Sequence, residues 1–464
     1  MKKILYISLF SIAALGSGCD DLLEFGPTDD GVVLAENALE TPEDLQRLLN
    51  SCYDVFANTY DGDVQFINEL LGDNLNGVNP NNLTLTDIYN REAGDFNGLT
   101  NGVYNDFYYS IFRSNAILEN FDLVSGLSDA ERLRMEAEAK FIRAVSHWEL
   151  VKLYGQPFGY TSDNSHLGVI LRTEPSQESR SRSTVEEVYN LVLEDLLFAE
   201  QYLPASNDVY ATSYAANSYL AKIYFLMGNY QAAAAEASLA MSGPFQLDTL
   251  LGRYDQFAIS DETIFGFVSK VLEAGPNPVA DNRVGAFISA YSGNTPNAAF
   301  DGAAFNSMFI GSSDLRVGTY YTAPTEVLGN AKVAKFNAQF FNHAVTSVTE
   351  MMLIMAESNA ELGSGLDQSI DYINAIRERA FENSAFNLDD NASAAAIIAA
   401  SRLERRIEFV GEGKRLDDLK RQGVKGENIL VRGAPWDCNG MVVQFPLGEN
   451  VVPNFQDNPV GGCN

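Results

Sequence analysis

Small side chains at helical spacing constrain the fold of this chain more than any other pattern in it. Between about residues 213 and 242, alanines and one tyrosine recur at three- and four-residue steps on both sides of Gly228-Asn229. The residues of this pattern are Ala221, Tyr224, Ala233, Ala237 and Ala240. Small side chains let two helices approach closely, and the tyrosine fills the space between them. The pattern therefore predicts a tightly packed pair of antiparallel helices.

A weaker copy of this pattern runs from about 350 to 379, through Ala356, Gly363, Tyr372 and Ala375. Two copies in a helix-rich chain favour a tetratricopeptide-like scaffold of helix hairpins. Further helices are predicted to begin after Thr41, after Ser128, and after Ser183 or Thr184. Thr41 is followed by a proline and acids, Ser128 can form a capping box with Glu131, and the third start has acids in its first turn. The predicted fold class is therefore mainly α.

Residues 243–348 differ from the rest of the chain. Gly, Asn, Ser, Thr and Pro become frequent there and helical periodicity fades, while the alternation around Ile264 predicts a short strand. We expect a loop-rich, irregular insert with few short strands, carried by the helical scaffold. The predicted division is a helical N-terminal region, 41–242, and a C-terminal region, 243–464, that contains the insert. Loops on a rigid scaffold commonly carry binding functions.

The first residues are typical of an exported lipoprotein. Lys2 and Lys3 precede a short apolar run, which ends in Gly16-Ser17-Gly18-Cys19. We expect residues 1–18 to be a lipoprotein signal peptide, Cys19 to be the lipidated mature N-terminus, and residues 19–40 to be a tether. An ordinary secreted protein is the alternative. Downstream, no apolar stretch is long enough to span a membrane.

The net charge and the positions of the cysteines limit the partners and metal sites that the chain can have. A formal net charge of −31 argues against a nucleic-acid partner, which would require basic patches. Cys52 stands alone in a helical segment and is expected to be buried. Cys438 and Cys463 could form a disulfide in an oxidising compartment, and their spacing does not fit a zinc site.

The sequence offers little catalytic chemistry. It contains three histidines and lacks the HExxH, GxSxG, P-loop and dinucleotide-binding motifs. We expect no enzyme activity, no metal and no cofactor. Two alternatives stay open at this stage: a surface glycosidase, which would need two carboxylates facing each other across a cleft, and a purely structural tetratricopeptide-like adaptor.

Several ordered sequence blocks resemble the SusD/RagB family over nearly the whole mature chain. These blocks are residues 103–115, 137–157, 184–204, 314–316, 373–379 and 404–419. In the last block Glu404, Glu408 and Glu412 are four residues apart. We expect Glu408, Arg406, Arg415 and Asp418 to form a partly buried ion network that ties this segment to the scaffold. Such networks are more often structural than catalytic.

The resemblance implies a function. Members of this family are lipid-anchored at the cell surface, on the outer membrane, where they bind glycans and deliver them to a SusC-like TonB-dependent transporter. Capture of peptides or another nutrient by the same mechanism is the alternative. Asp20 and Asp21, which follow Cys19, are consistent with export to the surface.

The resemblance also implies where a ligand would bind. Family ligand contacts come from loops after the first helices and from the central insert. The candidate ligand-binding residues in these stretches are Asp73, Asn74, Asn76, Tyr89, Arg91, Phe96, Tyr291, Tyr320 and Tyr321. Aromatic faces stack on sugars, and amides and carboxylates bond their hydroxyl groups.

Overall fold

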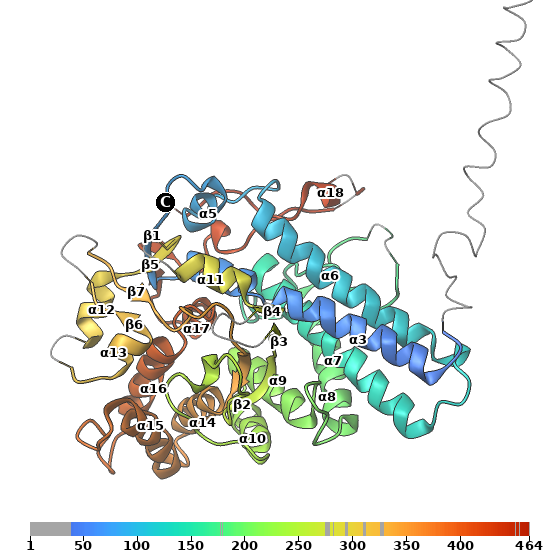
Figure 1. Ribbon diagram of the computed structural model, residues 1–464. Helices are drawn as coiled ribbons and strands as arrows, with labels where there is room; N and C mark the ends of the chain where they lie inside the picture. Colours follow the sequence, from blue (N-terminus) through green and yellow to red (C-terminus); the bar gives the residue numbers. More distant parts are fainter. Residues whose placement is uncertain are drawn as a thin grey trace, which may run out of the picture.

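The computed structural model describes residues 39–464 apart from 177, 179, 274–278, 282, 293–295, 310–311, 325–328, 451, 454 and 464. Cys19, the predicted signal peptide and nearly all of the predicted tether lie outside the described residues. The described chain is mainly helical, with a few short strands, as predicted (Figure 1). No helix among the described residues combines the length and the apolar character that crossing a membrane requires.

The N-terminal half is built mainly of helices. They are α3 (Pro42–Thr59), α4 (Asp63–Leu71), α5 (Leu83–Tyr89), α6 (Gly98–Glu119), α7 (Asp129–Tyr154), α8 (Val185–Tyr202), α9 (Ser213–Leu226) and α10 (Tyr230–Ala240), with the 3₁₀ turn η1 (Phe121–Leu123) after α6. From α6 to α10, each helix packs on the next along the chain. The capping boxes at Thr41, Ser128 and Thr184 are present, so these three predicted helix starts are confirmed. Their side chains satisfy backbone N–H groups that a helix start leaves unpaired.

The predicted helix hairpin is the pair α9 and α10. Ala221, Ala233, Ala237 and Ala240 are all fully buried between these helices and α14 (Val348–Leu362). Then α15 (Leu366–Phe381) packs back on α14, and α16 (Ala394–Glu408) covers both. Gly363 ends α14 in the left-handed conformation that glycine adopts readily. The second predicted repeat is therefore also a helix hairpin.

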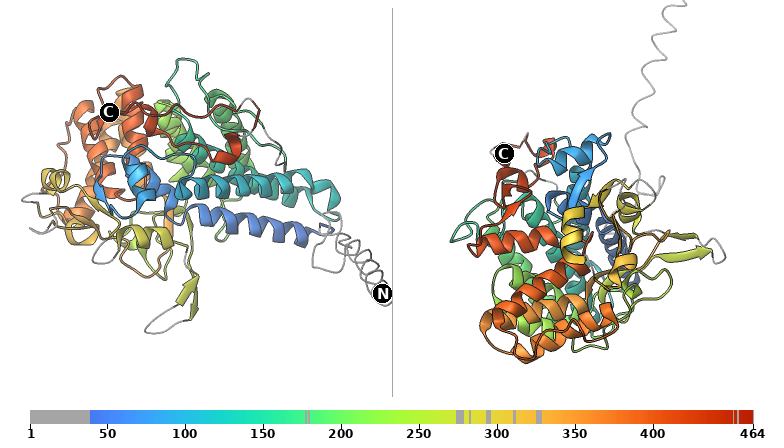
Figure 2. Two further views of the ribbon diagram at one scale, coloured as in Figure 1. Left: turned by 90° about the horizontal axis from the view of Figure 1, so that it is seen from above. Right: turned by 90° about the vertical axis from the view of Figure 1, so that its left-hand side faces the viewer.

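Among its described residues, the insert contains three two-stranded antiparallel ladders, and a fourth joins it to the N-terminal half. Its elements are η2 (Gly252–Tyr254), β2 (Thr263–Phe267), β3 (Lys270–Glu273), β4 (Val279–Asp281), α11 (Gly285–Tyr291), β5 (Ala298–Phe300), α12 (Gly302–Phe309), α13 (Arg316–Thr319), β6 (Tyr321–Thr322), β7 (Lys332–Val333) and β8 (His343–Ser347). β2 pairs with β8, β3 with β4 and β6 with β7, while β5 pairs with β1 (Leu75–Val78) of the N-terminal half. The β3–β4 hairpin projects from the body (Figure 2).

The C-terminal segment runs back over the N-terminal helices. It contains α17 (Arg415–Val424), β9 (Leu430–Val431), β10 (Ala434–Pro435), η3 (Asn439–Met441) and α18 (Leu447–Asn450). Cys438 and Cys463 are joined by a disulfide. Asn458 donates from Nδ2 to the carbonyl oxygens of Tyr154 and Val443, at 2.9 and 2.8 Å. The disulfide therefore ties the end of the tail to the residue before η3, and a buried hydrogen bond fastens the tail to the end of α7.

Candidate functional site

The strand pair β1–β5 brings together the two regions in which ligand contacts are expected. Leu75 lies opposite Phe300 and Val78 opposite Ala298, and the Asn79 backbone N–H donates to the Asn297 carbonyl at 2.9 Å. Phe300 also forms an isolated antiparallel β-bridge with Ala331, so that a second part of the insert joins the same edge. The loop after α4 and two segments of the insert therefore form one continuous surface.

Exposed and half-buried amide side chains collect along this edge. We call the set Asn76, Asn79, Asn81, Asn297 and Asn330 the amide surface. Asn330 donates from Nδ2 to the Asn76 carbonyl at 3.0 Å, which holds the insert against β1. Asn79, Asn81 and Asn76 are exposed. Because an amide can both donate and accept, such a surface suits a ligand that carries hydroxyl groups.

Two apolar side chains flank the amide surface. Leu83 at the start of α5 is 71% exposed, and Phe96 is 75% exposed. The neighbouring Asn97 donates from Nδ2 to the Thr84 carbonyl at 2.9 Å, so the loop with Phe96 lies beside the start of α5. Exposed aromatic and aliphatic groups next to amides are what stacking on a sugar ring requires.

Asp73 and Asn74, both candidate ligand residues, are occupied by internal contacts. Asp73 accepts two hydrogen bonds from Arg415, at 2.7 and 2.9 Å, and Asn74 accepts one from Arg406 at 3.0 Å. Burial opposes ionisation of Asp73, but the hydrogen bonds and charge of Arg415, with the charge of Arg406, keep the pKa of this carboxyl below its ordinary value. These residues brace the strand that carries Asn76.

Tyr89 and Arg91 also support the chain around the amide surface. The Tyr89 hydroxyl accepts a hydrogen bond from the Gly77 backbone N–H at 3.0 Å, and the Arg432 guanidinium lies 3.8 Å from the centre of the Tyr89 ring. Arg91 donates to the Val431 carbonyl. Both side chains therefore link α5 and its following loop to β1 and to the β9–β10 hairpin.

The placement of the three insert tyrosines corrects the expectation that they contact a ligand. Tyr291, Tyr320 and Tyr321 are each at most 1% exposed. The Tyr320 hydroxyl donates to the Leu250 carbonyl at 2.6 Å, and that of Tyr321 to the Ile407 carbonyl at 3.1 Å. Their rings pack within the core, because the insert folds them inward against α16 and α4. They fix the insert and offer no surface to a ligand.

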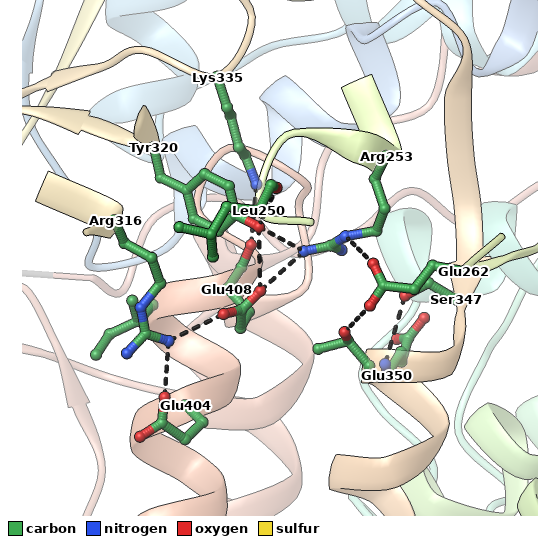
Figure 3. A network of polar contacts seen from close by, with 12 residues as sticks. Leu250, Arg253, Glu262, Arg316, Tyr320, Lys335, Ser347, Glu350, Glu404 and Glu408 are labelled. Atoms are coloured by element: carbon green, nitrogen blue, oxygen red, sulfur yellow. Dashed lines mark hydrogen bonds and ion pairs between the residues drawn. The ribbon is translucent and has the colours of Figure 1, made fainter. Parts of the chain in front are cut away.

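A buried ion network fastens the insert to α16 (Figure 3). Glu408 accepts from Arg253, Arg316 and Arg379, with N···O distances of 2.9, 2.9 and 2.8 Å. Burial raises its pKa, but these three guanidinium groups outweigh burial and lower the pKa of Glu408 to about 2. Nearby, Lys335 of the insert pairs with Glu412 at 2.6 Å. The network therefore sets the position of the insert, and with it Asn297 and Asn330.

The partners within the last family block differ from those expected. Arg406 and Arg415 both pair with Asp73, at 3.7 and 2.7 Å, and Asp418 pairs with Arg405 at 3.0 Å. The expected single cluster of Glu408, Arg406, Arg415 and Asp418 is therefore wrong. Separate pairs replace it, because adjacent residues on a helix face different directions: Arg405 meets Asp418, and Arg406 meets Asp73.

Sequence reasoning missed five residues of this surface and its border: Asn79, Asn81, Leu83, Asn297 and Asn330. The run Asn79-Pro80-Asn81-Asn82 was the available signal, since asparagine and proline at this density indicate an exposed turn. Nothing local in sequence marks Asn297 or Asn330. Within the part of the chain that the structure describes, no three His, Cys, Asp or Glu side chains are grouped as metal ligands.

Two family models match the chain in order. The first, described as starch-binding and associating with the outer membrane, matches residues 33–225. The second, described as the SusD family, matches residues 348–436. The chain belongs to the SusD/RagB family. The amide surface of this SusD-family protein joins residues of the first matched region to the insert between the two.

Known SusD-family proteins resemble the chain over most of its length. SusD-like protein P2 of Formosa agariphila is 24% identical and is matched over 94% of this chain and 96% of its own. The crystal structure of a SusD superfamily protein from Bacteroides vulgatus superimposes with a TM-score of 0.77 at 20% identity, covering 91% of this chain and 99% of that one. Surface glycan-binding protein A from Bacteroides uniformis gives a TM-score of 0.72 at 18% identity, with 90% and 99% covered.

Proposed function

We propose that this protein is a cell-surface lipoprotein that captures glycans and delivers them to a SusC-like TonB-dependent transporter. The ordered match to two SusD-family models carries the proposal, because the first is described as starch-binding and associating with the outer membrane. The anchor would be Cys19. The proposed role is binding without catalysis, in line with the name of one structural neighbour, surface glycan-binding protein A.

The amide surface is the proposed capture site. Its support is the meeting of β1 with β5 and the exposure of Asn76, Asn79 and Asn81 beside Leu83 and Phe96. Amide groups would hydrogen-bond ring hydroxyls, while the two apolar side chains would contact the carbon–hydrogen faces of the sugar. Most sugars are uncharged, so a site without a dominant charge suits them.

Binding of the chain that begins at Asp20 to a panel of polysaccharides tests the proposal, since that chain keeps every described residue. We expect retardation in affinity gels by one class of glycan, saturable heat of binding, and no breakdown products. An Asn76→Ala/Asn81→Ala double variant should weaken binding about thirtyfold, because it removes two hydrogen bonds to a ligand and each is worth about 1 kcal/mol. Leu239→Ala, on the exposed face of α10, is the control.

The outcomes separate the alternatives. Released sugar in the mixtures would overturn the claim that the protein is not an enzyme. No glycan binding, together with binding of peptides, would transfer the same capture role to a peptide ligand. Co-purification of a barrel transporter with the lipidated protein from outer membranes would test the partner, and a protein that consistently purifies alone would contradict the delivery step.

A further inference from the structure

A groove of about 350 Å³ lies along the solvent side of α6, and the proposed function makes no use of it. We call it the tyrosine groove and define it by Tyr104, Tyr108, Tyr109, Phe112, Arg172 and Glu449. It shares no residue with the amide surface: the groove is lined by α6, α18 and the segment 170–176, whereas the amide surface lies on β1, β5 and their flanking loops. Its volume falls within the range of about 300–1,000 Å³ that small-molecule pockets occupy.

The aromatic side chains form a stripe because of their helical spacing. Tyr104, Tyr108 and Phe112 follow one another at four-residue steps on α6, and Tyr109 lies beside them. The inner face of the same helix buries Phe107 and other apolar residues against α3 and α7. Tyr109 is 48% exposed and therefore contributes little to the packing of the core.

The segment 170–176 forms one wall of the groove and is fixed to α6. The Tyr108 hydroxyl donates to the Ile170 carbonyl at 2.9 Å. Asn115 donates from Nδ2 to the carbonyls of Arg172 and Glu174, at 2.9 and 3.2 Å. The backbone N–H of Arg172 donates to His147 Nε2 at 3.2 Å. The wall is therefore preorganised by part-buried hydrogen bonds.

The C-terminal tail closes the other end of the groove. The Tyr104 hydroxyl donates to Glu449 Oε1 at 3.0 Å, so that a carboxylate from α18 lies at the start of the aromatic stripe. Burial, then the neighbouring Tyr108 and the charge of Glu449, raise the pKa of Tyr104, which keeps this hydroxyl a protonated donor. Three chain segments that are distant in sequence thus converge on the same groove.

Hydrogen-bonding groups remain available along the groove. Among the described residues, Arg172 uses Nη1 to donate to the carbonyls of Ser176 and Glu178, and its Nε and Nη2 have no acceptor. Glu449 Oε2 receives no hydrogen bond from these residues, and Asn105 is an exposed amide at the rim. Arg113 covers one face of the Tyr109 ring at 4.4 Å, which leaves the other for a ligand.

We propose that the tyrosine groove is a second saccharide site. It binds a neutral oligosaccharide, of which one or two sugar rings contact the protein. A pyranose ring has apolar carbon–hydrogen faces and a rim of hydroxyl groups. Tyr109 and Phe112 match the faces, while the free guanidinium N–H groups, the free carboxylate oxygen and the amide match the rim. One positive and one negative group in the groove favour a ligand without net charge.

This proposal rests on the proposed function and extends it. A glycan chain that reaches both the amide surface and the tyrosine groove would be held at two points. Once one site has bound the chain, binding at the other site is intramolecular. Linked contacts of this kind raise the overall affinity for a long chain well above that for a short one. Long glycans would therefore be retained while short ones dissociate.

The test uses the chain that begins at Asp20, with calorimetry against malto-, cello-, xylo- and laminari-oligosaccharides. Tyr109→Ala removes the exposed ring, and Asn105→Trp fills the groove from its rim; both residues are exposed, so the fold should be kept. We expect either variant to weaken one of two binding events by about tenfold or more, as loss of an aromatic contact in a site typically does. Leu239→Ala should change nothing.

Each result has a distinct meaning. Loss of one site in the groove variants, and of the other in Asn76→Ala/Asn81→Ala, supports both proposals. Unchanged binding in the groove variants, with loss in the amide variant, overturns the second site alone. Loss in the groove variants alone keeps the tyrosine groove and overturns the amide surface as capture site. No binding of any of these sugars by the unmodified protein overturns both.

Discussion

At Glu408, one buried carboxylate receives guanidinium groups from three different parts of the chain. Arg253 and Arg316 come from the insert, and Arg379 from α15. The cost of desolvating so many charges is offset only while every partner is present. The residue therefore acts as a common attachment point for the insert and the second helix hairpin.

Replacing Glu408 by Gln should lower the free energy of unfolding by about 3–5 kcal/mol, because it leaves three buried cations without a full counter-charge. Chemical denaturation followed by circular dichroism measures this. Glu186→Gln is the matched control, since Glu186 is exposed on α8 and should shift stability by no more than about 0.5 kcal/mol. Equal effects of the two changes would show that the network adds nothing.

The same carboxylate predicts acid sensitivity. Its pKa falls from an ordinary 4.5 to about 2 on folding, so its contribution to stability is complete above pH 4.5 and is lost as the pH falls towards 2. We expect the melting temperature to drop on going from pH 6 to pH 3, and to drop less steeply in Glu408→Gln. Parallel pH profiles for the two proteins would contradict this assignment.

At the scale of the element, the helix hairpins depend on small residues. Ala237→Leu should destabilise the protein by about 1–3 kcal/mol, because the position is fully buried where α10 meets its neighbours and extra methyl groups must displace them. Ala235→Leu adds the same atoms on the exposed side of α10 and should be almost neutral. Thermal unfolding of the two variants compares them directly, and equal melting temperatures would argue against close packing here.

Helices could be predicted from the sequence where the residues that determine them lie close together in the chain. The capping boxes and the alanine spacing of α9–α10 lie within a few residues of one another, so the helices could be predicted. The partners of Glu408 could not, because Arg253 and Arg316 are 155 and 92 residues away in the chain. Tyr320 and Tyr321 lie in an irregular segment without periodicity, so nothing in the sequence showed that they face inward.

At the scale of the whole molecule, the excess of acidic residues dominates the electrostatic energy of the folded chain. A formal charge of −31 makes the folded chain repel itself, and salt screens that repulsion. We expect the melting temperature to rise as the NaCl concentration increases from about 0.02 to 0.5 M. Over this range the Debye screening length falls from about 20 Å to about 4 Å, so that repulsion between surface charges is largely screened. A fall would mean that screening of favourable ion pairs outweighs relief of repulsion. Sucrose at equal osmolality is the control.

The junction of β1 with β5 has a consequence for how the protein matures. Asn76 and Asn330 are separated by 254 residues, so a partly synthesised or truncated chain holds only half of the amide surface. Loop closure over such a distance must precede the contact. The amide surface therefore forms only in a chain that extends at least to Asn330, after the insert has folded back onto β1.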